Sequence, residues 1–206
     1  MTPALTLYTN PMSRGRTARW MLEETGLPYE VHNVAFGQAM KSPAYTAINP
    51  MGKVPALTHG DVVVTETAAI LMHLADLVPE KQLAPPVGDP ARGSYYRWLC
   101  FVAGPVEAAS TARSLGLTLT PEQSMSAGFG SHEMVVGTLE QTLSQGPYLC
   151  AGHFTAADLY MAAWVGWGMQ CGDLPRSGVF SEYAERHLQR PAALRAAQLD
   201  GPEHLA

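Results

Sequence analysis

The chain has 206 residues, of which 47% are hydrophobic and 15% are charged. This composition excludes an intrinsically disordered protein and is enough to build one large domain or two small ones. The net charge of −5 leaves no basic surface that could meet phosphate groups, so no nucleic-acid partner is expected.

The start of the chain and its cysteines indicate the cellular compartment of the protein. Residues 1–5 contain neither a basic segment nor a long apolar run, so we expect no signal peptide. No stretch approaches the roughly 18 apolar residues that a membrane helix needs. Cys100, Cys150 and Cys171 are odd in number and far apart, which is typical of free thiols in a reducing environment. We therefore predict a cytoplasmic protein with no membrane partner.

The first elements form a β-α-β pattern. Residues 5–9 alternate apolar and polar, as a short strand does. A helix is expected from Arg14 to Gly26, because its apolar residues recur at helical spacing and glycine is a favoured residue after a helix end. Residues 29–34 read as a second strand. A unit of this length predicts two parallel strands.

The pattern then continues to the end of a first domain. Residues 42–49 predict a short irregular helix, and residues 51–57 a loop that runs into a third strand. His59-Gly-Asp61 predicts a hairpin turn to a fourth strand at residues 62–64. A helix follows from Thr65 to Leu77. The predicted order is therefore β-α-β-α-β-β-α.

A linker rich in proline and glycine divides the chain. We expect an α/β domain over residues 1–80, a linker over residues 81–91 and an all-α domain over residues 92–206. A bend is expected at Gly104-Pro105, because proline inside a helix removes a hydrogen bond. The helices predicted after the linker cover residues 91–115, 121–143, 155–169, 181–189 and 191–197.

The start of the helix near Thr65 suggests a binding site. Thr65 would be the N-cap, which places Glu66 and Thr67 in the first turn, where free N–H groups attract a carboxylate. Glu66 could hold an ammonium beside it, so the pair suits an α-amino acid head group. A capped surface helix is the alternative.

Pro55 adds to this interpretation. Because proline cannot donate to a sheet, we expect it at a sheet edge. If the Val54–Pro55 bond is cis, the Val54 N–H and C=O groups could face a bound peptide as an added strand would.

The helix start at Thr155 predicts a structural cap rather than a binding site. Thr155-Ala-Ala-Asp158 resembles a capping box with Asp in place of the usual Glu. A catalytic Asp158 is an alternative, but the cap accounts for both Thr155 and Asp158, so we predict a structural role.

Four motifs in this order resemble those of cytosolic glutathione transferases of bacterial type. They are Ser13 to Tyr29, Asn49 to Leu57, Thr65-Glu-Thr67 and Gly152 to Asp158, and the resemblance extends over nearly the whole chain. The resemblance implies a thioredoxin-like N-terminal domain, a helical C-terminal domain that lines an electrophile site, and a homodimer. It also implies glutathione as co-substrate and a role in detoxification.

The resemblance assigns roles to the central stretch. It makes Pro55 cis and pairs Val54 with the cysteinyl part of glutathione. It places Glu66 and Thr67 at the γ-glutamyl end. The lysines would lie toward the glycine carboxylate. The implied glutathione-binding residues are Lys41, Lys53, Val54, Pro55, Glu66 and Thr67.

The chemistry requires a thiolate, because the neutral thiol is a poor nucleophile. We predict that Ser13 donates a hydrogen bond to the glutathione sulfur and that Arg14 adds positive potential. Asn10 and Tyr8 are the alternatives, and Ser13 could also be an ordinary N-cap. Some bacterial members carry a cysteine where this chain has Arg14, which argues against a mixed disulfide with glutathione.

The electrophile would be a small hydrophobic molecule. Aromatic or Met side chains at helical spacing more often belong to a core, and this is the alternative for the candidates. The candidate lining residues are Met12, Tyr95, Tyr96, Trp98, Val102 and Thr111.

Other functions remain open at this point. The seven histidines show no metal-ligand spacing, so we expect no metal. A glutathione-dependent peroxidase, thiol-exchange enzyme or isomerase could use the same scaffold. A non-catalytic binding or assembly protein could also keep the fold, although it would not need a zwitterion site.

Overall fold

A computed structural model describes residues 4–176 and 178–201 of the chain. Its contacts divide the chain into two compact units. The first unit runs to Lys81 and also includes the chain from Gln189 onward, and the second unit runs from Gln82 to Leu188. Each unit is described by itself below.

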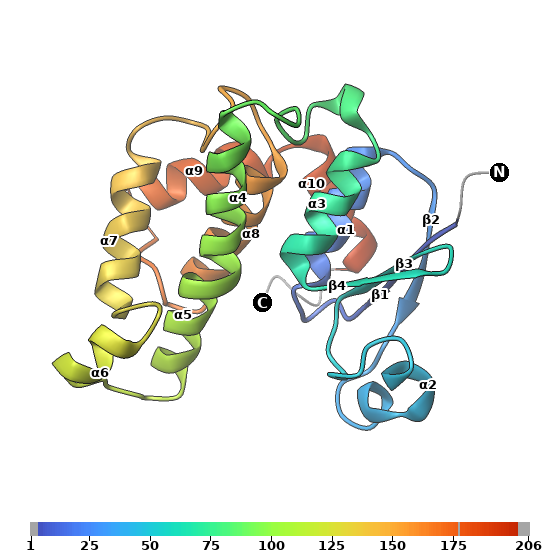
Figure 1. The fold of residues 1–206 in the computed structure, drawn as a ribbon, viewed down its shortest axis with the longest axis horizontal. Coiled ribbons are helices and arrows are strands. Elements are labelled where there is room, and N and C mark those ends of the chain that lie inside the picture. Colours follow the sequence, from blue (N-terminus) through green and yellow to red (C-terminus); the bar gives the residue numbers. More distant parts are fainter. Residues whose placement is uncertain (1–3, 177, 202–206) are drawn as a thin grey trace. The chain divides into compact units, whose positions relative to one another are not determined.

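The first unit contains a four-stranded sheet of order β2-β1-β3-β4 (Figure 1). β1 and β2 are parallel, and β3 is antiparallel to both of its neighbours. The strands are β1 (Leu5–Thr9), β2 (Tyr29–Asn33), β3 (Ala56–His59) and β4 (Val62–Thr65). The predicted thioredoxin-like order and the parallel first pair are therefore confirmed.

Helices cover this sheet on both sides (Figure 1). α1 and α3 lie on one face, where Leu5, Leu7 and Thr9 of β1 are buried, because alternate residues of a strand point to the same face. α2 lies on the opposite side, and α10 lies beside α1. The helical segments of this unit are α1 (Gly15–Thr25), η1 (Ala39–Lys41), α2 (Pro43–Thr46), α3 (Thr67–Asp76), η2 (Pro79–Lys81) and α10 (Pro191–Asp200).

Two local predictions in this unit were wrong. Thr65 is the last residue of β4, and Glu66 rather than Thr65 occupies the N-cap position of α3. Pro55 does not lie on an edge strand, because β3 pairs on both sides and begins one residue later, at Ala56. In that position proline removes no hydrogen bond between strands. Its inability to donate to a sheet is thus accommodated just before β3 rather than on an edge strand.

The last helix belongs by its contacts to the first unit, although the chain order predicts it in the all-α domain. Arg19 of α1 forms a buried ion pair with Asp200 of α10, with 2.9 Å between Nε and Oδ1. Arg190, just before α10, forms a bidentate pair with Glu24 of α1 at 2.7 and 2.9 Å. These side chains lie far apart in the sequence, so helical periodicity could not show that α10 packs on α1.

The second unit is all-α. Its helical segments are α4 (Ala91–Phe101), η3 (Val102–Val106), α5 (Glu107–Ser114), α6 (Pro121–Ser126), α7 (His132–Leu143), α8 (Ala156–Gln170) and α9 (Gly178–Leu188). η3 is a π-helical turn that contains Pro105, so the predicted disturbance at Gly104-Pro105 is confirmed. Among the described residues, no helix has both the length and the apolar character that a bilayer crossing needs.

One predicted helix is divided in two. Residues 121–143 form α6 and α7 rather than one long helix. Gly130 takes a positive φ of 67°, and Ser131 then starts α7 by accepting a hydrogen bond from Met134 N at 3.2 Å. Serine caps a new helix well, so the glycine and serine override the apolar spacing.

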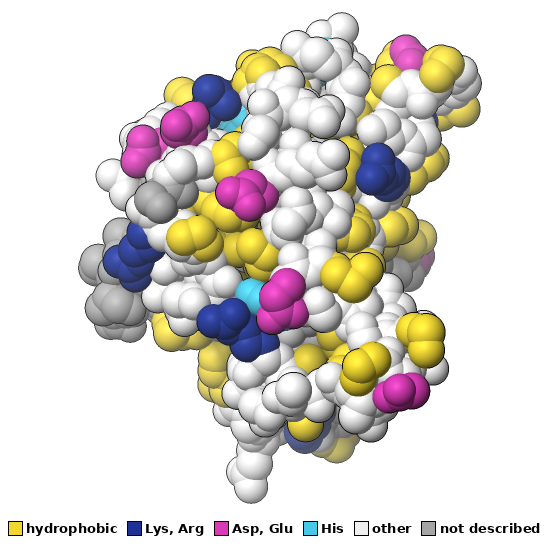
Figure 2. All heavy atoms as spheres, turned by 90° about the vertical axis from the view of Figure 1, so that its left-hand side faces the viewer, with side chains coloured by type: hydrophobic (Ala, Val, Ile, Leu, Met, Phe, Trp, Pro, Cys, Tyr) yellow, Lys and Arg dark blue, Asp and Glu magenta, His cyan; other side chains and the backbone are white. Residues whose placement is uncertain are grey.

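The face drawn in Figure 2 shows hydrophobic side chains at several places among charged and other polar ones. Leu115, Leu117, Met125 and Met134 are all more than half exposed. They belong to the segments around α5, α6 and α7. Leu115 and Leu117 line one open depression and Met125 and Met134 line another, and exposure alone gives these positions no functional assignment.

Candidate functional site

The register of the sheet brings three predicted segments to one end of the first unit. Ala56 of β3 pairs with Tyr8 of β1 and with Thr65 of β4. The loop after β1, the residues before β3 and the start of α3 therefore leave the sheet at the same end. Three segments that are separated in the sequence thus surround a single location.

Glu66 has an unusual backbone at this location. Its φ is 67° and its ψ is 120°, whereas residues with a side chain rarely adopt a positive φ. Glu66 is exposed and forms no capping hydrogen bond with its side chain among the described residues. The helix begins with Ile70 N donating to Glu66 O at 3.0 Å, which leaves the first-turn N–H groups without partners in the helix. Thr67, half-buried, is the first helical residue.

The Val54–Pro55 peptide bond is cis, as the resemblance implies. Val54 is half-buried and Pro55 is buried, and β3 starts immediately afterwards. The backbone of Val54 thus lies beyond the paired part of the sheet. Its role in ligand binding is a prediction that these contacts leave untested.

Ser13 lies in the loop between β1 and α1. Its hydroxyl donates to Asn10 O at 2.6 Å and accepts from Gly15 N at 3.0 Å. The same Asn10 carbonyl also accepts from Ser13 N at 3.0 Å. Arg14, half-buried, occupies the N-cap position of α1. Ser13 therefore fixes the turn that starts α1, and its hydroxyl stands at the N-terminus of that helix.

Asn10 and Tyr8, the alternative thiol-activating residues, are less available than Ser13 to donate to a thiol. Both polar atoms of the Asn10 amide bind the backbone, because Nδ2 donates to Val34 O at 3.0 Å and Oδ1 accepts from Met12 N at 2.9 Å. The ring of Tyr8 stacks on His32 with 5.2 Å between ring centroids. Tyr8 points to the sheet face opposite that of its neighbours in β1, because side chains alternate along a strand.

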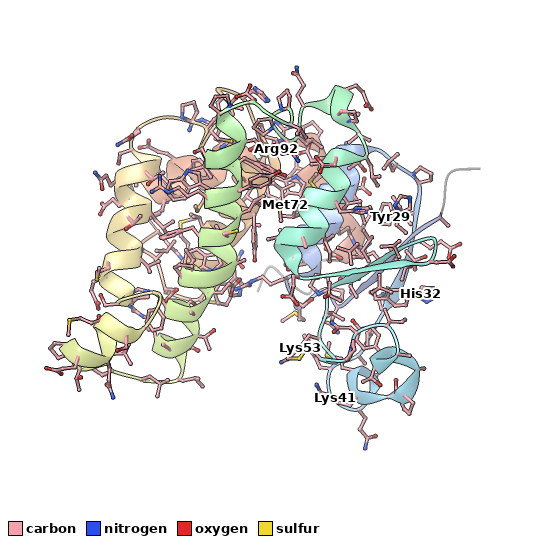
Figure 3. All side chains as sticks on the ribbon, viewed as in Figure 1. Tyr29, His32, Lys41, Lys53, Met72 and Arg92 are labelled. Carbon is pink, nitrogen blue, oxygen red and sulfur yellow. The ribbon has the colours of Figure 1, made fainter. Side chains whose placement is uncertain are left out.

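Lys41 and Lys53 lie beside α2 in the first unit (Figure 3). The Lys41 ammonium donates to Met51 O at 2.9 Å and to Gly52 O at 3.2 Å. Both lysines, together with Gly52, line an open depression of about 510 Å³. Two of the three ammonium N–H groups of Lys41 thus hold the chain before Val54.

Two residues that the sequence did not single out hold the same loop from the other side. Tyr45 OH donates to Lys53 O at 2.6 Å, and Asn49 Nδ2 donates to that carbonyl at 2.8 Å. Burial raises the pKa of Tyr45, so the phenol stays a donor at neutral pH. A Cβ at Gly52 would lie 2.5 Å from Met40 O, and Gly52 has a φ of 57°. The sequence could suggest the positive φ of Gly52, but it could not suggest the hydrogen bonds of Tyr45 and Asn49.

The candidate electrophile residues separate into two groups. Tyr95, Trp98 and Val102 are buried in the second unit, with exposed fractions of 0%, 3% and 0%, so they are core residues there. Tyr96 and Thr111 are exposed in the same unit, and Tyr96 OH accepts from Arg92 Nε at 2.6 Å. In the first unit, Met12 is 63% exposed.

Thr155 and Asp158 form the predicted cap at the start of α8. Asp158 is completely buried, and its carboxylate accepts from Thr155 N and Thr155 Oγ1, both at 2.9 Å. It also accepts from Leu149 N at 2.8 Å and from Tyr183 OH at 2.9 Å. Burial and the neighbouring Asp158 raise the pKa of Tyr183 well above its usual value. Every contact of this carboxylate is structural.

Within residues 4–176 and 178–201, no group of three or more His, Cys, Asp or Glu side chains is arranged to hold a metal ion. Cys100, Cys150 and Cys171 are free thiols.

Residues 3–76 match the protein family described as Glutathione S-transferase, N-terminal domain. The chain is 30% identical over 160 residues to glutathione S-transferase GstA of Escherichia coli O157:H7, which covers 76% of this chain and 78% of that protein. It is 27% identical over 203 residues to glutathione S-transferase GST-4.5 of Xanthomonas campestris pv. campestris, which covers 95% of this chain and 98% of the relative.

Solved structures give the same result over almost the whole chain. A glutathione transferase from Methylococcus capsulatus str. Bath superposes with a TM-score of 0.80 at 32% identity and covers 96% of this chain and 99% of its own. A sphingomonad glutathione S-transferase complexed with glutathione has a TM-score of 0.76 at 27% identity, with coverages of 95% and 98%.

Proposed function

The chain belongs to the glutathione S-transferase family, and from this premise we propose that it binds glutathione in its first unit and adds the thiolate to a small hydrophobic electrophile. The reaction and the substrate class follow from the residues of this chain. The location at the end of the sheet would hold glutathione.

The backbone of Glu66 is the observation that carries the proposal. A glutamate at a φ of 67° is costly, and such outliers are retained where function demands them. The first-turn N–H groups of α3 and the Thr67 hydroxyl can bind the α-carboxylate of the γ-glutamyl residue. The exposed Glu66 carboxylate can bind its ammonium. This pair of charges matches the zwitterionic head of glutathione.

The remaining parts of glutathione fit the neighbouring segments. The N–H and C=O groups of Val54 can pair with the cysteinyl residue as an added strand does, with cis Pro55 fixing the turn before β3. Lys53, which is exposed, can meet the glycine carboxylate. Lys41 lies in the same depression and donates to Met51 O and Gly52 O, so it would support the site by holding the chain before Val54.

Ser13 would then stabilise the thiolate. A free thiol has a pKa of about 8.5, and lowering it by about two units requires about 3 kcal/mol of preference for the charged form. A hydroxyl hydrogen bond and a helix N-terminus each contribute about 1 kcal/mol. Turning the Ser13 hydrogen from Asn10 O to sulfur leaves that carbonyl with its bond from Ser13 N, so the reorientation costs little. Arg14 adds positive potential.

Of the candidate electrophile residues, Met12 in the first unit and Tyr96 and Thr111 in the second have exposed side chains that a ligand can reach. Tyr95, Trp98 and Val102 are buried in the core of the second unit. We also propose a homodimer and a cytoplasmic role in detoxification. The free thiols of the three cysteines support a reducing compartment, and light scattering measures the oligomeric state.

Calorimetric titration with glutathione, followed by conjugation of a chromogenic aryl halide, tests the function. We expect binding at or below millimolar glutathione and turnover that Ser13→Ala reduces without abolishing binding. Parallel assays with a hydroperoxide and a mixed disulfide separate transfer from peroxidase or exchange chemistry. Absence of binding at millimolar glutathione would refute the proposal and select a non-catalytic role.

A further inference from the structure

The residue that ends β1, Thr9, is completely buried. Its hydroxyl oxygen has no hydrogen-bond partner among residues 4–176 and 178–201. Its backbone carbonyl is engaged, because Val34 N donates to it at 2.7 Å. A buried hydroxyl without a partner is costly, and valine would fill the same volume without that cost. The unused hydroxyl therefore calls for an explanation.

The hydroxyl lies against the start of α1. A Cβ built on Gly15 would lie 1.8 Å from Thr9 Oγ1 and 3.0 Å from Ser13 Oγ. The two oxygens therefore lie within about 4.8 Å of each other, and they form no hydrogen bond in this structure. Because Gly15 has no side chain, nothing from that residue stands between them. Any other residue at position 15 would collide with Thr9.

The hydrogen bonds of Ser13 leave a place for a second donor. A serine hydroxyl donates once and can accept twice. Ser13 Oγ donates to Asn10 O and accepts from Gly15 N, which uses its hydrogen and one of its lone pairs. Thr9 Oγ1 has a hydrogen to give and lies on the buried side of the same turn.

We propose that Thr9 is a positioning residue for thiol activation: its hydroxyl, which has no partner among the described residues, turns to donate to Ser13 Oγ when glutathione binds and so frees the Ser13 hydrogen for the glutathione sulfur. This inference rests on the proposed function. A second donor to Ser13 Oγ makes the Ser13 hydroxyl a better donor, because hydrogen bonds in a chain polarise one another. No covalent bond changes in this arrangement, and the thiol proton leaves to solvent. Thr9 itself does not touch glutathione.

The matched variants Thr9→Val and Thr9→Ser test the proposal. Thr9→Val keeps the volume and removes the hydroxyl, whereas Thr9→Ser keeps the hydroxyl. The pKa of bound glutathione is read from the pH dependence of thiolate ultraviolet absorbance and from the pH profile of kcat/KM. We expect Thr9→Val to raise that pKa and to lower kcat/KM about three- to tenfold below it, as loss of one hydrogen bond predicts. We expect the Kd for glutathione to stay within about twofold, and Thr9→Ser to restore the profile.

A double-mutant cycle shows whether Thr9 acts through Ser13. In a Ser13→Ala background, Thr9→Val is expected to have no further effect on the thiol pKa. A Thr9→Val protein with the wild-type pH profile would overturn the inference, as would an equal loss in both backgrounds. Thr9→Ala is the second hydroxyl-free variant, should valine impair folding. If the wild-type protein itself neither binds glutathione nor forms the thiolate, it is the proposed function that fails.

Discussion

Two helix starts in this molecule look alike in sequence and differ in structure. α3 follows Thr65-Glu66-Thr67, and α8 follows Thr155-Ala-Ala-Asp158. At α8 the carboxylate is completely buried and accepts bonds from two backbone N–H groups and two hydroxyls. At α3 the carboxylate is exposed and caps nothing among the described residues.

The difference separates a structural acid from one that we propose to bind a ligand. A buried acid whose acceptors are all used has no capacity left for a ligand. An exposed acid beside uncapped N–H groups keeps that capacity, and at Glu66 it does so on a disfavoured backbone. Satisfaction of hydrogen bonds, rather than residue type, therefore distinguishes the two sites.

The largest effect should come from Asp158. Asp158→Ala leaves the N–H groups of Leu149 and Thr155 and the hydroxyls of Thr155 and Tyr183 without their acceptor. We expect the free energy of unfolding in urea to fall by about 4 kcal/mol. Asp158→Asn, which keeps an acceptor oxygen, should lose less. A folded Asp158→Ala protein that has lost turnover but not stability would mean that this acid is catalytic after all.

Glu66 should show the opposite pattern. Glu66→Ala removes the carboxylate that would bind the glutathione ammonium, so affinity should fall about 30-fold, which corresponds to about 2 kcal/mol. Stability should change by less than about 0.5 kcal/mol, because the side chain is exposed. Calorimetry and urea unfolding measure the two quantities.

Glu66→Gly is the matched control for the backbone. Glycine accepts a positive φ, so this variant should lose the same affinity while gaining up to about 1 kcal/mol of stability. Equal affinity of wild type and both variants for glutathione would remove Glu66 from the binding site.

The contrast between the two lysines gives a smaller effect. If Lys53 meets the glycine carboxylate directly, Lys53→Met should weaken glutathione about fivefold and leave γ-glutamylcysteine, which lacks glycine, unchanged. Lys41 holds the carbonyls of Met51 and Gly52, so Lys41→Met should weaken both ligands by similar factors. Calorimetry with the two ligands provides the comparison, and a selective loss of glutathione in Lys41→Met would reverse these assignments.

Much of the first unit could be predicted because its signals are local. The alternation in residues 5–9, the Gly26 helix end and the turn at residues 59–61 each lie within a few residues, and each is confirmed. The cap at Thr155 was visible for the same reason, since its partner Asp158 is three residues away.

What the sequence missed depends on backbone conformation and on side-chain placement that residue types do not encode. The positive φ of Glu66 follows from the way β4 passes into α3, which no residue type encodes. Tyr45 and Asn49 became supporting residues only when the fold placed them beside Lys53 O. The sequence likewise gives no sign that the Thr9 hydroxyl is buried against Gly15.

The smallest effect is a pH dependence that should belong to α3 and not to α8. His73 of α3 lies 3.1 Å from His59 of β3, measured from Nε2 to Nδ1, so only one hydrogen fits between the rings. Burial lowers the pKa of His73, the charge of His59 lowers it further, and Asp76 opposes both. The folded state therefore binds the proton less tightly than the unfolded state, whose histidine pKa is about 6.5.

Because the pKa of His73 is lower in the folded state than in the unfolded state, stability should fall as the pH falls. The contribution of His73 to stability is complete above pH about 6.5 and is lost as the pH falls below it toward the lowered pKa of the folded state. Because His73 is partly exposed, solvent screens the pair, and the loss should stay below about 1 kcal/mol. Urea unfolding at several pH values between about 7.5 and 5.5 should show this loss in the wild type and a flatter profile in His73→Gln. His32→Gln, at an exposed position of β2, is the matched control and should keep the wild-type slope. An unchanged slope in His73→Gln would place the pH dependence outside α3.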